Sequence, residues 1–111
     1  MQVNEETIDG VLVVSPAGRL DSNTSPEFEA HLFQRMEDHP SLVIRFGDVD
    51  YISSAGLRVM LMTAKKVKQN GGRLVLCEIG DPIREVFEIS GFLTILEVCD
   101  DPRGAVERVN A

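Results

Sequence analysis

The sequence has little of the chemistry that marks metal-binding or redox proteins. Its 111 residues contain no tryptophan, one tyrosine and two cysteines, Cys77 and Cys99. The two cysteines lie far apart, and neither has a cysteine or histidine at metal-ligand or CxxC spacing. We therefore expect two free thiols, with Cys77 buried at the end of an apolar run, and neither a metal site nor a cofactor.

Basic residues are also few. Lysine and arginine together number 11 against 18 aspartates and glutamates, which gives a net charge of −7. An acidic chain is not attracted to nucleic acid or to anionic lipid, so we expect neither as a partner. No apolar run approaches the roughly 20 residues of a membrane-spanning helix, and the first residues lack the pattern of a signal peptide. The cytoplasm is the expected location.

Local patterns predict one α/β domain over residues 1–111. Proline follows serine or aspartate at Pro26, Pro82 and Pro102, and each pair predicts a helix start. A fourth helix is expected from the serines at 53–54 to the Asn-Gly-Gly stop at 70–72. Apolar runs predict strands at 3–8, 11–14, 42–46, 73–77 and 94–98, with turns at 9–10 and 47–50. This alternation favours a mixed, mostly parallel sheet of about five strands with about four helices.

Two adjacent serines, Ser53 and Ser54, stand where the strand pattern gives way to a helical one. A serine at such a junction caps the helix, because its side-chain oxygen accepts a hydrogen bond from a free N–H of the first turn. The same junction suits a phosphate, since free N–H groups and the positive end of the helix dipole converge there. The residues alone leave two interpretations of Ser54: a structural cap or a serine that is phosphorylated.

The neighbours of Ser54 do not favour a catalytic role. A nucleophile elbow requires glycine two residues before the serine, and this chain has Ile52 there. Both histidines, His31 and His39, precede the serine, an order that fits no familiar catalytic triad. The chain has no Walker A or dinucleotide-binding glycine pattern. We therefore expect that the protein is not an enzyme.

Two segments together indicate a known family. Residues 18–24 (Gly-Arg-Leu-Asp-Ser-Asn-Thr) and 49–57 (Val-Asp-Tyr-Ile-Ser-Ser-Ala-Gly-Leu) resemble the STAS domain family, in particular the stand-alone bacterial anti-sigma factor antagonists. The resemblance covers essentially the whole chain and implies the STAS fold of the antagonist type. It implies binding to an anti-sigma factor that is also a serine kinase of the GHKL ATPase type, which releases a sigma factor. Phosphorylation of one serine breaks that complex, and a PP2C-type phosphatase restores binding.

The family motif reads Asp-Ser-Ser-Gly-Leu, and its first serine is phosphorylated. Aligned on Gly56 and Leu57, this chain has Ser53 in place of the aspartate, Ser54 on the phosphorylated serine and Ala55 on the second serine. The resemblance thus makes Ser54 the acceptor and Ser53 a second candidate. It also implies a partner-binding face formed by Asp21, Ser22, Asn23, Thr24, Ser53, Ala55, Gly56, Leu57 and Arg58. From the residues alone, 21–24 also fit a solvated loop, and Arg58 fits an ordinary surface charge.

Related stand-alone STAS domains have other roles, as scaffolds or as transporter-associated subunits in lipid traffic, without a sigma-factor target. The shared fold does not separate these roles. The intact serine and the match at 21–24 favour the phosphorylation switch. A monomer is the expected state, with pairing through an exposed N-terminal edge strand as the alternative.

Overall fold

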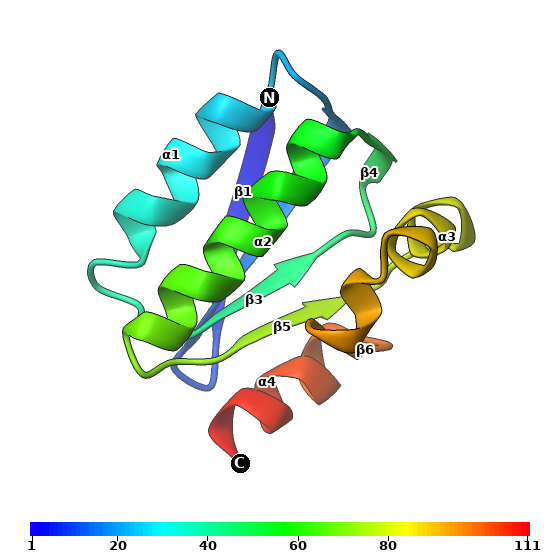
Figure 1. The fold of residues 1–111 in the computed structure, drawn as a ribbon. Helices are drawn as coiled ribbons and strands as arrows, with labels where there is room; N and C mark the ends of the chain where they lie inside the picture. The colour runs from blue at the N-terminus through cyan, green and yellow to red at the C-terminus, as the bar shows by residue number, and fades with distance from the viewer.

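The computed structural model describes residues 1–111 as a six-stranded mixed sheet with helices on both faces (Figure 1). Strands β1 (Gln2–Ile8) and β2 (Val11–Leu20) form the predicted antiparallel hairpin. Strands β3 (Leu42–Arg45), β5 (Leu74–Cys77) and β6 (Glu97–Cys99) continue the sheet in parallel. The spatial order is β1-β2-β3-β5-β6, so the predicted mixed, mostly parallel sheet is confirmed.

A further strand, β4 (Val49–Ile52), lies where the sequence predicted the end of a turn. It pairs in parallel with the C-terminal half of β2, and Leu20 lies opposite Ile52. The long β2 therefore pairs with β3 along its first half and with β4 along its second. The turn prediction was wrong here because β4 is short and its two central residues, Asp50 and Tyr51, are exposed, which leaves no continuous apolar run.

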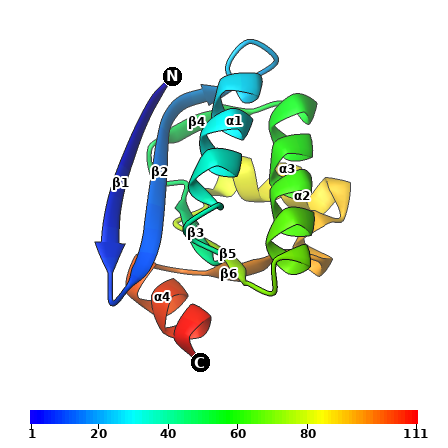
Figure 2. The same ribbon diagram turned by 90° about the vertical axis from the view of Figure 1, so that its left-hand side faces the viewer.

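The helices form a layer on each face of the sheet (Figure 2). Helices α1 (Ser25–Arg35) and α2 (Ser54–Gln69) lie side by side on one face, and α4 (Pro102–Asn110) lies on the other. Helix α3 (Asp81–Ser90) packs against β4. The three helices predicted from a proline pair are present, and each has the proline in its first turn: α4 begins at Pro102, whereas α1 and α3 begin one residue earlier, at Ser25 and Asp81. None of the helices combines the length and the apolar character that a bilayer span requires.

The last predicted strand is displaced along the chain. Residues Phe92–Thr94 form a short 3-10 helix, η1, and β6 covers only Glu97–Cys99. Gly91 ends α3 in the left-handed conformation (φ 77°), and the Thr94 hydroxyl donates a hydrogen bond to the Gly91 carbonyl oxygen at 2.7 Å. This local turn removes the first half of the predicted strand 94–98 from the sheet, although its β-branched residues suit a strand.

The sheet separates two apolar clusters. The larger contains 21 buried residues and packs α1, α2 and α3 against the sheet, with Phe46 and Phe87 in edge-to-face contact at 5.7 Å between ring centroids. The smaller contains 7 buried residues and packs α4 against the other face. It includes Cys77, whose burial raises the pKa of its thiol to about 12. Cys77 is thus buried as predicted, and Cys99 on β6 is half-buried; both are free thiols.

Candidate functional site

The two serines before α2 have different roles. Helix α2 begins at Ser54, and Ser53 is the residue that caps it. The Ser53 backbone is extended (φ −96°, ψ 177°), and its Oγ accepts a hydrogen bond from the Gly56 N–H at 3.5 Å. Ser54 is the first helical residue and is exposed, and its hydroxyl takes part in no hydrogen bond within the protein. The interpretation of Ser54 as the cap is therefore wrong, because Ser53 occupies that position.

Gly56 allows the start of α2 to approach the ends of β2 and β4 closely. A Cβ atom at this position would lie 2.7 Å from Ile52 Cγ1 and 2.9 Å from the Leu20 carbonyl oxygen. The Ser53 N–H donates a hydrogen bond to the same carbonyl oxygen at 2.8 Å. Leu57 is buried in the larger apolar cluster. Gly56 and Leu57 therefore fix the position of the helix start and lie beneath the predicted partner-binding face.

Hydrogen bonds around Asp21 hold the loop between β2 and α1. Asp21 Oδ1 accepts from the N–H groups of Asn23 and Thr24 at 3.0 and 3.1 Å. The Thr24 hydroxyl donates to the Arg19 carbonyl oxygen at 2.6 Å and accepts from the Asp21 N–H at 3.0 Å. The Thr24 N–H is the main cause that lowers the pKa of Asp21 from its ordinary value of 3.8. The loop therefore presents Ser22 and Asn23, both exposed, on a hydrogen-bonded turn.

The first turns of α1 and α2 enclose a hollow of about 160 Å³ beside this loop. Ala55 and Arg58 line it from α2, and Glu29 lines it from α1. The Ser25 hydroxyl is buried, has no hydrogen-bond partner, and belongs to a residue of the same lining. The full lining is Ser22, Ser25, Pro26, Glu29, Ala55, Arg58 and Val59. The structure thus places Ser22 of the loop at 21–24 beside Ala55 and Arg58 in the first turns of α2.

Sequence reasoning missed Arg19 and Tyr51, which extend this surface. The Arg19 guanidinium carbon lies 4.1 Å from the centroid of the Tyr51 ring, a cation–π contact. Arg19 Nε also lies 3.7 Å from Asp21 Oδ2. The pair forms because Arg19 and Tyr51 are register partners between β2 and β4. No pattern within either segment indicated this contact, since β4 itself was not predicted.

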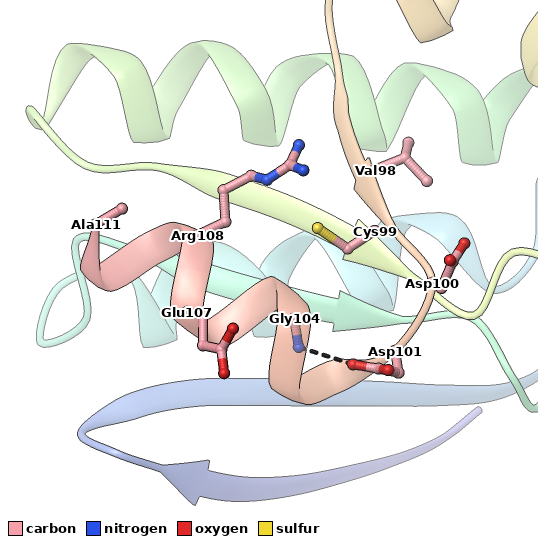
Figure 3. Close-up of a pocket in the computed structure, with 8 residues that line it drawn as sticks. All are labelled: Val98, Cys99, Asp100, Asp101, Gly104, Glu107, Arg108 and Ala111. Atoms are coloured by element: carbon pink, nitrogen blue, oxygen red, sulfur yellow. Dashed lines mark hydrogen bonds between the residues drawn. The ribbon is translucent and has the colours of Figure 1, made fainter.

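A larger hollow of about 610 Å³ lies on the other side of the sheet, between β6 and α4 (Figure 3). Cys99 and Arg108 contribute to its lining, and Asp101 accepts a hydrogen bond from the Gly104 N–H at 2.7 Å. Arg108 lies 4.0 Å from the carboxylate of Glu97. No residue of the predicted phosphorylation site or partner-binding face lines this hollow.

Comparison with known proteins gives matches over nearly the full length of the chain. The profile of the STAS domain matches residues 2–105. The chain is 42% identical over 106 residues to BtrV of Bordetella bronchiseptica, whose assigned name is that of an anti-sigma factor antagonist; the match covers 95% of this chain and 91% of that protein. It is 32% identical over 94 residues to the anti-sigma-B factor antagonist of Bacillus subtilis, covering 85% of this chain and 86% of that protein.

A solved structure shows the same arrangement of strands and helices. The crystal structure of an anti-sigma factor antagonist from Mycobacterium paratuberculosis matches with a TM-score of 0.89 and 26% sequence identity. The match covers 99% of this chain and 94% of that one. The similarity in sequence and the similarity in fold therefore extend over the same residues, the segments around 21–24 and 53–58 included.

Proposed function

The chain belongs to the STAS domain family, and from this premise we propose that it is an anti-sigma factor antagonist. Without phosphate it binds an anti-sigma factor, which then releases its sigma factor; phosphorylation of Ser54 ends the binding. The names of similar proteins support this role over those of a scaffold or a transporter-associated subunit in lipid traffic. The observation that carries the switch is the exposed, unbonded hydroxyl of Ser54 at the first position of α2.

The partner that we propose is an anti-sigma factor that is also a serine kinase of the GHKL ATPase type. In the reaction, Ser54 Oγ attacks the γ-phosphorus of ATP and loses its proton, and ADP leaves. Ser53 is the poorer acceptor, because it is half-buried and its oxygen already accepts a hydrogen bond from Gly56. A PP2C-type phosphatase removes the phosphate and restores binding.

A phosphate at Ser54 changes the binding surface more than it changes the fold. It adds about −1.5 to −2 charges at neutral pH, and the positive end of the α2 dipole tolerates that charge. A partner packed on Ser54 and on the exposed residues Ser22, Asn23 and Arg58 would have to desolvate the phosphate and accommodate its volume. A loss of about 3 kcal/mol is enough to weaken binding more than a hundredfold.

The test is mass spectrometry of the intact protein and its peptides after incubation with ATP and the GHKL-type kinase encoded nearest to this gene. We expect one phosphate in the wild-type protein and in Ser53→Ala, and none in Ser54→Ala. Binding of the same kinase is then measured for the phosphorylated and unphosphorylated proteins, and phosphate is expected to weaken it at least a hundredfold. Phosphate that persists in Ser54→Ala, or equal affinity of the two forms, would contradict the proposal.

A further inference from the structure

Arg58 lies one helical turn after Ser54 on α2. Side chains at positions i and i+4 of a helix are neighbours, with Cβ atoms about 5 to 6 Å apart. Both residues are exposed, and Arg58 takes part in none of the ion pairs of the structure. An anion that precedes a cation by four residues has the favourable orientation relative to the helix dipole.

Two other arginines that flank β4 are already engaged. Arg19 stacks on Tyr51, and Arg45 forms ion pairs with Glu78 and Asp48. Neither is free to bind a new anion without losing an existing contact. Arg58 therefore supplies an uncommitted guanidinium group within one turn of Ser54.

The hollow that Arg58 lines contains a second uncommitted donor. Ser25 is only 3% exposed, and its buried hydroxyl has no hydrogen-bond partner. Most buried hydroxyl groups are hydrogen-bonded. The Ser25 hydroxyl is an exception, and it can therefore still donate a hydrogen bond to an acceptor. Glu29 is the acidic residue that lines the same hollow from α1, and it forms no ion pair with Arg58. Asp21 in the neighbouring loop is engaged by the N–H groups of its own turn.

We infer that Arg58 binds the phosphate of phosphorylated Ser54 within the same helix. The inference rests on the proposed function, because it concerns the regulation of the same site. A guanidinium group forms paired, charge-assisted hydrogen bonds with phosphate oxygens. Phosphorylation therefore changes the partner-binding face twice: it adds an anion at Ser54, and it withdraws the Arg58 cation from contact with a partner.

The test is a ³¹P NMR titration of the full chain with phosphoserine installed at position 54 during translation, so that no kinase is needed. A nearby guanidinium stabilises the phosphate dianion and lowers its second pKa, which is about 6 in unpaired phosphoserine. We expect Arg58→Gln to raise this phosphate pKa by roughly 0.3 to 0.5 units, and Arg58→Lys to retain part of the shift as a point charge. Glu29→Gln has the opposite expected sign, because it removes a negative charge from the hollow that Arg58 lines.

Lys65→Gln is the matched control, because it removes one positive charge from the same helix. At 1.5 Å per residue, Lys65 lies roughly 16 Å beyond Ser54 along the axis, twice the Debye length of about 8 Å at physiological ionic strength. We expect no measurable change in the phosphate pKa for this variant, and circular dichroism checks that each variant is folded. An unchanged pKa in Arg58→Gln, or an equal shift in Lys65→Gln, overturns the inference.

The outcome is independent of the proposed function, since neither kinase nor partner enters the experiment. If Arg58 does not bind the phosphate, Ser54 remains the proposed acceptor. If instead the kinase fails to modify Ser54, the titration still measures the contact between phosphoserine and Arg58. The two failures are therefore distinguishable.

Discussion

The first turns of α2 and α4 are capped in the same way. In α2 the Ser53 side chain caps the helix by accepting from the Gly56 N–H, and in α4 the Asp101 side chain accepts from the Gly104 N–H. In both helices the donor is the glycine three residues after the cap. The same local hydrogen bond thus starts a helix on each face of the sheet.

The two helix starts differ in the groups that they leave unbonded. The residue after the cap is Ser54 in α2, an exposed hydroxyl, but Pro102 in α4, which has no reactive group. The larger hollow lies beside α4, where Asp101 is engaged in the cap. The smaller hollow lies beside α2, where Arg58 and the buried hydroxyl of Ser25 have no partner. Asp100 and Glu107 of the larger hollow are also unpaired, but its arginine, Arg108, lies 4.0 Å from Glu97. An unpaired cation and a buried free hydroxyl, rather than hollow volume, therefore distinguish the candidate site.

Exchanging each glycine for alanine should give the largest difference between the two helix starts. A Cβ at position 56 would lie 2.9 Å from the backbone oxygen of Leu20, whereas one at position 104 would lie 3.3 Å from the side-chain carboxylate of Asp101. We expect Gly56→Ala to lower the free energy of unfolding by about 2 to 3 kcal/mol, because the neighbouring strand backbone cannot move away freely. Gly104→Ala should change it by no more than about 0.5 kcal/mol. Urea denaturation of both variants measures the difference, and equal losses would show that the close approach at Gly56 is unimportant.

Removing each cap should give a smaller difference, in the opposite direction. The Asp101 bond to Gly104 is short at 2.7 Å, while the Ser53 bond to Gly56 is long at 3.5 Å. We expect Asp101→Ala to cost about 1 to 2 kcal/mol of unfolding free energy and Ser53→Ala about 0.5 kcal/mol. Thermal unfolding of the two variants compares them. A larger loss in Ser53→Ala would mean that the serine supports more than one N–H group of α2.

The helix starts were the most predictable part of this fold. Pro26, Pro82 and Pro102 all lie in the first turn of a helix, as the proline pairs predicted. Of the residues before them only Asp101 caps its helix, since Ser25 and Asp81 are themselves the first helical residues. The strand β4 was not predictable, because its stability comes from pairing with β2 and its own residues are half exposed. The displacement of β6 was not predictable either, because the local turn that follows Gly91 keeps the first residues of the predicted strand out of the sheet.

The helix start at the candidate site was predictable, but the roles of its two serines were not. The sequence showed two serines at a helix start, and only the backbone geometry shows that Ser53 caps the helix while Ser54 is left free. The contact between Arg19 and Tyr51 depends on the register between two strands, which neither segment encodes by itself. A single sequence thus does not show which residues of two different strands lie next to each other. The hydrogen bonding within one turn, in contrast, can be inferred from the residues of that turn.

The smallest expected effect concerns the acid sensitivity of the two aspartates that accept backbone N–H groups, Asp21 and Asp101. Asp21 accepts two such bonds, and the one from the Thr24 N–H is the main cause that lowers the pKa of Asp21 from its ordinary value of 3.8. A lowered pKa in the folded state means that Asp21 stabilises the fold above pH 3.8, and that this contribution is lost as the pH falls through the folded value. We expect the urea midpoint of the wild type to fall more steeply below about pH 4 than that of Asp21→Asn, which retains an acceptor oxygen but has no charge to lose. Asp101→Asn, measured over the same pH range, is the control that shows whether the effect is specific to the loop of Asp21. If the urea midpoints of the wild type and of Asp21→Asn fall equally with pH, the charge of Asp21 does not stabilise its turn.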